Sequence, residues 1–96
     1  MSRVVWTRRA LEDTQAIKAF IERDSPQAAA LIVKRILAAI EQLPTFPESG
    51  RIVPEYREVA LREIIRPPYR IVYRLLQEEI HIITVHHAAR LLRLDL

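Results

Sequence analysis

The sequence predicts an α+β fold in which two helices pack against a sheet. Two stretches, 8–23 and 26–43, carry apolar residues at the spacing of one helix face. Three later stretches, roughly 59–65, 69–76 and 80–86, are rich in the β-branched and aromatic residues that strands favour. Short connections separate these three, so they should form an antiparallel meander. Helices followed by consecutive strands indicate one helical layer against a mainly antiparallel sheet.

The N-terminal elements have clear boundary signals. The stretch "RVVWT" at 3–7 reads as a short strand, and Thr7 is a suitable N-cap for the helix that follows. Ser25 is a second N-cap candidate, and Pro26 fits the first helical position, where its missing N–H costs nothing. Pro44 stops the second helix. Because so few residues join the helices, they should form an antiparallel hairpin, which makes the order β-α-α-β-β-β.

Arginines recur in the strand "YRIVYRL" at 69–75, and alternation predicts where they point. Successive side chains of a strand lie on opposite faces. One face carries residues that suit the core: Tyr69, Ile71, Tyr73 and Leu75. Arg70 and Arg74 flank Val72 on the other face. The strand is therefore predicted to be half buried, with guanidinium groups on its second face.

The remaining segments are connections and a terminal stretch. A proline-rich connection at 44–56 contains the only glycine, Gly50. "RPPY" should turn the chain between the first two strands of the meander, and "QEE" between the second and third. "AARLLRL" at 88–94 is apolar and compatible with a short C-terminal helix. The sequence has no internal repeat, so we expect a single domain over residues 1–96.

Composition narrows the choice of partners. The 96 residues hold 15 Lys plus Arg against 12 Asp plus Glu, and only Lys18 and Lys34 are lysines. The planar fork of arginine binds carboxylate or phosphate, which favours an acidic partner or a nucleic acid. A GC-rich genome explains the same bias, and a net charge of +3 does not require a polyanion. No apolar run is long enough to cross a membrane and no signal peptide is recognisable, so we expect a cytoplasmic protein.

Common catalytic motifs are missing from the sequence. The three histidines form no metal-binding motif, and the absence of cysteine excludes thiolate ligands, so we expect neither metal nor cofactor. No serine lies in a GxSxG motif, and no glycine-rich phosphate loop is present. Hydride transfer, P-loop hydrolysis and serine hydrolysis are therefore poorly supported.

A polar cluster on the predicted sheet is the remaining candidate site. Arg62, Arg70 and a histidine, either His86 or His87, would supply cations for a phosphate and an imidazole for proton transfer. Those are the ingredients of metal-free RNA cleavage. The alternative is that the arginines are solvated or paired on an open sheet face, their partners being Glu63, Glu78 and Glu79.

Four motifs, in order along nearly the whole chain, resemble the RelE/ParE superfamily of type II toxin–antitoxin toxins. They are "FPESGR.VPE" at 46–55, "LREII" at 61–65, "YRIVYR" at 69–74 and "I.TVHH.AR" at 82–90. The resemblance implies a cognate antitoxin whose C-terminal segment wraps the toxin, forming a toxin–antitoxin hetero-oligomer. It also implies one of two activities: RelE-like members cleave mRNA on the ribosome without metal, and ParE-like members poison DNA gyrase.

The match to the ribonuclease branch is partial. Arg70 falls on that branch's phosphate-binding arginine, and Arg90 is a counterpart of its second arginine. The branch's lysines before the "YR" strand are absent, and its C-terminal tyrosine is replaced, if at all, by His86 or His87. The ending "VHH.AR" looks more like ParE-type and plasmid-stabilisation proteins. The resemblance therefore favours a ParE-like gyrase poison without its own active site.

Two further functions stay open at this point, so the sequence does not decide whether the protein is an enzyme. One is a ribosome-dependent endoribonuclease, and the other is a degenerate toxin that retains only antitoxin binding. The arginine-bearing face suits an acidic, amphipathic antitoxin segment that folds on binding. The residues expected to bind the target or the antitoxin are Arg62, Arg70, Arg74, Arg90, Leu91 and Leu92.

Overall fold

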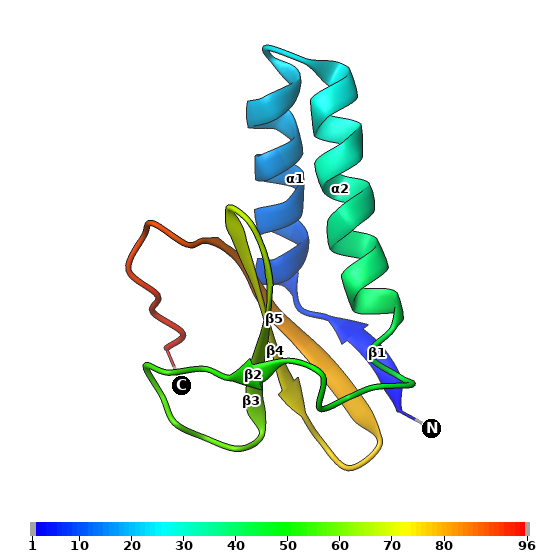
Figure 1. The fold of residues 1–96 in the computed structure, drawn as a ribbon, viewed down its shortest axis with the longest axis vertical. Helices are drawn as coiled ribbons and strands as arrows, with labels where there is room; N and C mark the ends of the chain where they lie inside the picture. The colour runs from blue at the N-terminus through cyan, green and yellow to red at the C-terminus, as the bar shows by residue number, and fades with distance from the viewer. Residues whose placement is uncertain (1, 96) are drawn as a thin grey trace.

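The structure, a computed structural model, describes residues 2–95 and consists of a helical hairpin against a five-stranded sheet (Figure 1). The elements are β1 (Arg3–Trp6), α1 (Arg8–Glu22), α2 (Pro26–Glu41), β2 (Arg51–Ile52), β3 (Leu61–Arg66), β4 (Tyr69–Leu75) and β5 (Glu79–His87). The strand order is β1-β5-β4-β3-β2. The predicted α+β fold is confirmed, together with its helical hairpin and its terminal meander. None of the helices among these residues is long and apolar enough to cross a membrane.

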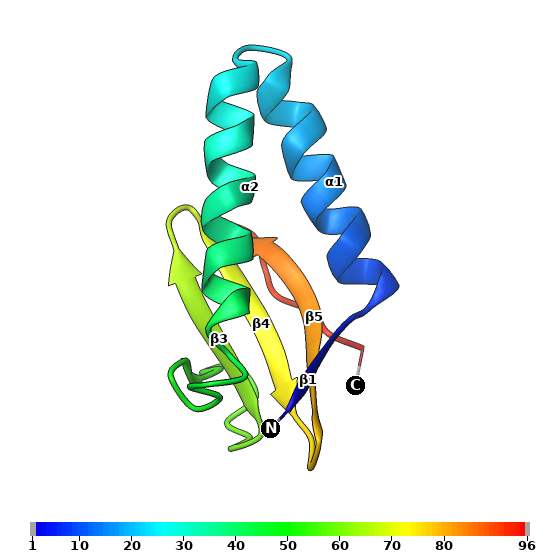
Figure 2. The ribbon, with the colours of Figure 1, turned by 90° about the vertical axis from the view of Figure 1, so that its right-hand side faces the viewer.

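Both helices begin where the sequence signals predict. The Thr7 side chain accepts a hydrogen bond from the backbone N–H of Ala10 at 3.1 Å, and Ser25 accepts one from Ala28 at 3.1 Å. Pro26 occupies the start of α2. Each cap satisfies a backbone donor that the first helical turn leaves free. The hairpin covers one face of the sheet with its lower part, and its far end projects beyond the strands (Figure 2).

The sheet is antiparallel except at one edge. β4 pairs with β3 and β5 in antiparallel register, whereas β1 lies parallel to the first half of β5, with Val4 opposite Ile80. Beyond the end of β1, residues of the hairpin take over the exposed edge of β5. Thr7 donates its hydroxyl to the Ile82 carbonyl at 2.7 Å, and Asp13 accepts the N–H of Val85 at 3.1 Å. The hairpin is thereby fixed to the strand that leads into the C-terminal segment.

A separate hydrophobic core lies on each face of the sheet. The larger one joins the helices to the predicted inner face of β4, where Tyr69, Ile71 and Tyr73 are buried and Leu75 packs at the margin. The smaller core covers the opposite face, and its buried members are Val53, Leu61, Val72, Leu92 and Leu94. The alternation predicted for β4 is therefore correct. Its second face, however, is not an open sheet surface, because a loop and the C-terminal segment cover it.

Residues 88–95, which we call the C-terminal segment, contain no helix, which corrects the helix considered for 88–94. A turn follows β5, and the chain then runs without regular structure along the far face of the sheet. Leu92 and Leu94 point into the smaller core with exposures of 4% and 5%, whereas Leu91 is 71% exposed. The Leu94 N–H donates to the Tyr56 hydroxyl at 3.0 Å. Burying alternate leucines outweighs helix formation, because so short a helix has little stability of its own.

The sequence does not predict strand β2. The path of the chain from the proline-rich connection into this strand depends on Gly50. A Cβ at this position would lie 2.6 Å from the Glu63 carbonyl oxygen and 2.7 Å from the Tyr73 hydroxyl. That hydroxyl accepts the Gly50 N–H at 2.9 Å and donates to the Pro47 carbonyl at 2.8 Å. Burial raises the pKa of Tyr73, so the hydroxyl keeps its proton at neutral pH. The tyrosine thus fixes the proline-rich connection against the sheet.

Candidate functional site

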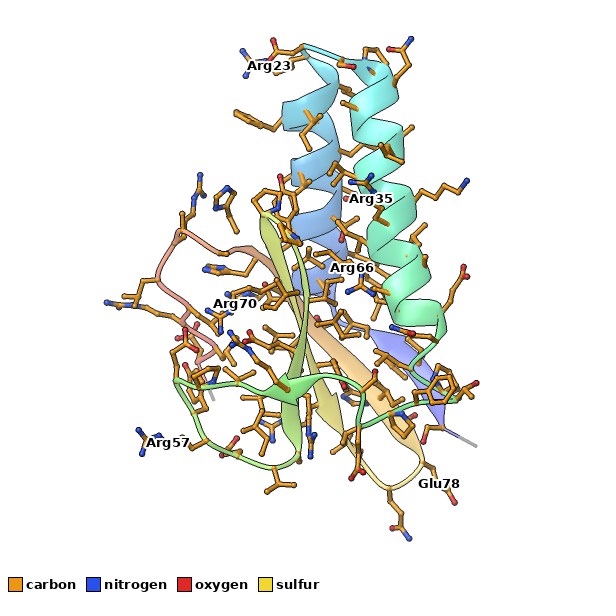
Figure 3. The ribbon with its side chains drawn as sticks, viewed as in Figure 1. Arg23, Arg35, Arg57, Arg66, Arg70 and Glu78 are labelled. Carbon is orange, nitrogen blue, oxygen red and sulfur yellow. The ribbon has the colours of Figure 1, made fainter. Side chains whose placement is uncertain are left out.

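Arg70 is the centre of a charged cluster on the face of the sheet opposite the helices. Its side chain is 9% exposed, and Nε donates to Glu63 Oε1 at 2.6 Å. Nη1 and Nη2 donate to the two oxygens of Glu55, each at 2.7 Å. Figure 3 shows Arg70 between the strands and the C-terminal segment. The outer fork of the guanidinium is therefore filled by a carboxylate of the protein itself, in the bidentate geometry that gives arginine its strongest pairs.

Glu63 is the fixed member of this cluster. It projects from β3 with a fully buried side chain, and its second oxygen accepts a hydrogen bond from Arg51 Nε of β2 at 2.6 Å. Two arginines thus face two carboxylates, and their formal charges cancel. A buried carboxylate is tolerated only when it is paired and hydrogen-bonded. We refer to Arg51, Glu55, Glu63 and Arg70 as the Arg70 cluster.

The pairing stabilises the charged forms of the two partners in the outer fork. Hydrogen bonds from Arg70 lower the pKa of Glu55 from 4.5 to about 2. The hydrogen bonds to Glu55, followed by those to Glu63, raise the pKa of Arg70 above its ordinary value. Both groups are charged at neutral pH, so neither is suited to transfer a proton there. The cluster can hold charge and position loops.

His86 is the only one of the two candidate histidines that shares a face with Arg70. The two residues lie opposite each other in the β4–β5 register. His86 Nε2 is 2.9 Å from the Arg90 carbonyl oxygen, and a carbonyl can only accept, so the nitrogen carries the hydrogen. The exposed Arg90 therefore meets His86 through its backbone, and this contact fixes the turn after β5.

His87 lies on the opposite face, toward the helices. It stands opposite Tyr69 in the register, and the two rings meet edge to face with centroids 5.6 Å apart. Its Nδ1 accepts the N–H of Ala89 at 3.1 Å. The structure therefore separates the two histidines that the sequence left as alternatives. Alternation along β5 has this effect on any two consecutive residues.

Arg62 does not join the cluster, contrary to the grouping expected from the sequence. It lies opposite Tyr73, on the helix-facing side of the sheet. Its guanidinium donates to the carbonyls of Val59 at 2.9 Å and Gly50 at 3.2 Å. On β3 it is Glu63 that shares the face of Arg70, since residues 62 and 63 point in opposite directions. Arg62 instead holds together two parts of the connection between α2 and β3.

The other residues proposed to bind the target or the antitoxin differ in how far they are exposed to solvent. Arg74 is partly exposed and lies 3.5 Å from Glu58, an exposed pair that contributes little. Leu91 is exposed, but Leu92 belongs to the smaller core. Of the three glutamates that the sequence offers as partners of the arginines, Glu63 alone forms an ion pair with Arg70. Glu79 instead binds His81 and Arg3, and the hydrogen bonds from His81 and then Arg3 lower the pKa of Glu79.

A surface pocket of about 460 Å³ adjoins the Arg70 cluster. Its lining residues are Arg51, Pro54, Glu55, Ile65, Arg70 and Ala88. Sequence reasoning missed Glu55 and Arg51, which lie on an irregular connection and on a two-residue strand. The only available signal was that both fall within the "FPESGR.VPE" motif. Across residues 2–95, no three side chains of the types that ligate metals gather closely enough to hold an ion.

Two comparisons of sequence identify the relatives of this chain. A family model described as the ParE toxin of the parDE type II toxin–antitoxin system matches residues 4–92. Toxin RelE2 of Caulobacter vibrioides is 41% identical over 92 residues, which cover 95% of this chain and 100% of that protein.

Two solved structures share the fold. The chromosomal ParDE system from P. aeruginosa matches with a TM-score of 0.73 and 24% identity, covering 91% of this chain and 96% of that chain. The toxin–antitoxin complex RelBE2 from Mycobacterium tuberculosis matches with a TM-score of 0.54 and 21% identity, covering 90% and 96% of the two chains. The family model extends over nearly the whole chain and a relative aligns along its full length, so the chain belongs to the ParE toxin family of type II toxin–antitoxin systems, within the RelE/ParE superfamily.

Proposed function

We propose that this toxin inhibits growth by poisoning DNA gyrase, as the ParE-like branch of its superfamily does. The observation that carries the proposal is the state of Arg70. Its fork is filled by Glu55 and its Nε by Glu63, so the folded protein presents no open pair of guanidinium N–H groups to an RNA phosphate. The match to a ParE family model supports the same branch.

The exposed part of the C-terminal segment is the proposed contact surface for the target. Arg90 and Leu91 are exposed there, whereas the neighbouring Leu92 is buried. An exposed arginine beside an exposed leucine is the kind of pair from which interface anchors are drawn. In this proposal the Arg70 cluster has no catalytic role and holds the loop that supports this segment.

A cognate antitoxin is the proposed second partner. Two solved structures with this fold are described as a ParDE system and as a RelBE2 toxin–antitoxin complex. The net charge of +3 suits an acidic antitoxin segment, which would neutralise the toxin within a hetero-oligomer. Binding of this kind predicts that co-expression of the antitoxin restores growth.

The alternative function is ribosome-dependent cleavage of mRNA. It is favoured by the position of His86 directly opposite Arg70 in the sheet and by the relative whose name is Toxin RelE2. In this case Arg70 would have to exchange Glu55 for a phosphate oxygen, and His86 would have to leave the Arg90 carbonyl. The two functions are separated by what is damaged, DNA or mRNA.

The deciding experiment adds the purified toxin to two reactions. One contains gyrase and relaxed plasmid, with the cleaved DNA trapped by detergent, and the other contains translating ribosomes with an end-labelled mRNA. We expect lost supercoiling, accumulated gyrase–DNA cleavage complexes and intact mRNA. Codon-phased cuts in the mRNA together with normal supercoiling would instead establish the ribonuclease.

Matched variants test the contact surface in the same assay. The double change Arg90→Ala and Leu91→Ala should weaken gyrase inhibition at least tenfold without changing the melting temperature, because neither side chain is buried. Arg23→Ala removes an exposed arginine at the far end of the hairpin (Figure 3) and should leave inhibition unchanged. Equal inhibition by both variants would remove the C-terminal segment from the contact surface.

A further inference from the structure

The two carboxylates of the Arg70 cluster are held in different ways. Glu63 comes from the middle of β3 and its side chain has no exposed surface. Glu55 belongs to the irregular loop between β2 and β3, and its side chain is 37% exposed. Glu63 therefore cannot leave the arginine without disrupting the sheet. Glu55 can leave through movement of a surface loop, and loops of this kind open more readily than strands.

Removal of Glu55 would leave a site that demands an anion. Arg51 and Arg70 would then share a single buried carboxylate, so the cluster would carry one uncompensated positive charge. Both Nη atoms of Arg70 would lose their acceptor. A poorly solvated guanidinium without a partner is costly, which gives any oxyanion that can reach it a strong advantage over water.

The surface pocket provides the route and the space for such an anion. Glu55 and Arg70 both line it, together with Arg51. The more exposed Glu55 carboxylate covers the outer N–H groups of the nearly buried guanidinium. The pocket, of about 460 Å³, is open to solvent and has room for a small oxyanion. Among the hydrogen bonds formed within residues 2–95, Arg51 uses only its Nε, which leaves further donors at the pocket wall.

We propose that the Arg70 cluster is an oxyanion-binding site, which Glu55 occupies from within and thereby closes to external carboxylate or phosphate. Glu55 acts as an internal substitute for the ligand: it presents two oxygens to two N–H groups, as a small carboxylate or a phosphate would. Displacement of the loop that carries Glu55 opens the site. Opening of the site is also what the ribonuclease alternative requires of Arg70, so the test below uses neither gyrase nor ribosomes.

Chemical rescue of a Glu55→Ala variant tests this site. The melting temperature is measured in chloride, acetate and inorganic phosphate at equal ionic strength, for the wild type, Glu55→Ala and the control Glu58→Ala. Glu58 lies in the same loop, and its side chain makes only a 3.5 Å contact with Arg74. We expect Glu55→Ala to melt lowest in chloride, and acetate or phosphate to recover most of the loss, saturating with ion concentration.

The control distinguishes a site from a general salt effect, because phosphate also stabilises proteins by exclusion from their surface. Wild type and Glu58→Ala should show only that general effect. A larger recovery by acetate than by phosphate would assign the site to carboxylates, and the reverse order would assign it to phosphates. The same response to all three ions in all three proteins would overturn the proposal.

A second variant covers the case in which Glu55→Ala does not fold. Glu55→Gln keeps the size of the side chain and one acceptor but removes the charge, so it should fold and still show a saturable response to oxyanions, smaller than that of the alanine variant. An ion response of Glu55→Gln no larger than that of Glu58→Ala would overturn the proposal independently of the first variant. Neither readout involves gyrase, ribosomes or growth.

Discussion

At the scale of single residues, Glu63 is the charged side chain on which the stability of the fold depends most. It is the fully buried carboxylate through which β2, β3 and β4 are joined by ion pairs. We predict that Glu63→Gln lowers the free energy of unfolding by about 3 kcal/mol or more, because two arginines then face a neutral amide in a poorly solvated site. Urea titration monitored by tryptophan fluorescence measures the loss.

The matched change is Glu58→Gln, which alters an exposed pair and should cost less than about 0.5 kcal/mol. A cost for Glu63→Gln as small as that for Glu58→Gln would show that Arg51 and Arg70 do not need this counter-charge. Because both variants are measured in the same denaturant, effects of urea that are common to the two cancel in the comparison.

Glu55 gives the protein a pH-dependent contribution to stability. Because Arg70 lowers its pKa from 4.5 to about 2, the ionised carboxyl stabilises the native state above pH 4.5. The contribution disappears as the pH falls through about 2. Since 37% of the side chain is exposed, solvent screening reduces it to about 1 kcal/mol. The stability difference between wild type and Glu55→Gln should therefore shrink between pH 5 and pH 2, as measured by urea titration at each pH. A constant difference across this range would contradict the assignment.

At the scale of elements, the entry to β2 depends on the close approach of the chain to β3. We predict that Gly50→Ala lowers the free energy of unfolding by about 2 kcal/mol, because its Cβ would meet the Glu63 carbonyl at 2.6 Å. Thermal unfolding followed by circular dichroism measures the loss. Thr45→Ala, at an exposed position of the same connection, should change stability by less than about 0.5 kcal/mol. Equal melting temperatures for the two variants would mean that the connection shifts to accommodate a methyl group.

The sequence predicts the elements that have periodicity and fails where periodicity is absent. The helices and the meander follow from apolar spacing, from caps at Thr7 and Ser25 and from short connections. β2 has two residues, too few to alternate. The apolar composition of residues 88–94 is also compatible with a short helix. Leu92 and Leu94 are two residues apart, however, and that spacing suits an extended segment with one buried side.

Of the candidate site, the sequence predicts only the residues that lie on a single strand, β4. Alternation correctly places Arg70 and Arg74 on the face opposite Tyr73. The partner Glu55 comes from a loop whose path depends on tertiary contacts, and no local pattern reveals it. Strand register also decides which neighbour faces Arg70, and the register excludes Arg62 in favour of Glu63.

At the scale of the whole molecule, the two cores share the same strands. Tyr73 packs toward the helices and its neighbour Val72 packs toward the C-terminal segment. We predict that Leu92→Ala lowers the stability of the whole protein by about 2–4 kcal/mol, including the helices on the opposite face. Far-ultraviolet circular dichroism follows the helices, and the fluorescence of Trp6 follows the larger core against which it packs. Both midpoints of urea unfolding should shift equally, although the mutation lies in the smaller core.

Leu91→Ala is the control for this prediction, since a side chain that is 71% exposed should contribute almost nothing to folding. If Leu92→Ala left both midpoints unchanged, the helix-side core would unfold independently of the face that the C-terminal segment covers. That result would restrict the contribution of the C-terminal segment to the face it covers.

The C-terminal segment is held largely through its main chain. His86 and Arg9 donate to the carbonyls of residues 90 and 93, at 2.9 Å and 2.7 Å, and the Tyr56 hydroxyl accepts from the backbone of residue 94. Such contacts do not depend on which side chains the segment carries. Apart from its two buried leucines, the segment is therefore free to change by mutation without cost to the fold. Over evolutionary time, its exposed side chains can therefore change faster than the sheet and hairpin, and with them the contact surface that we propose for the target.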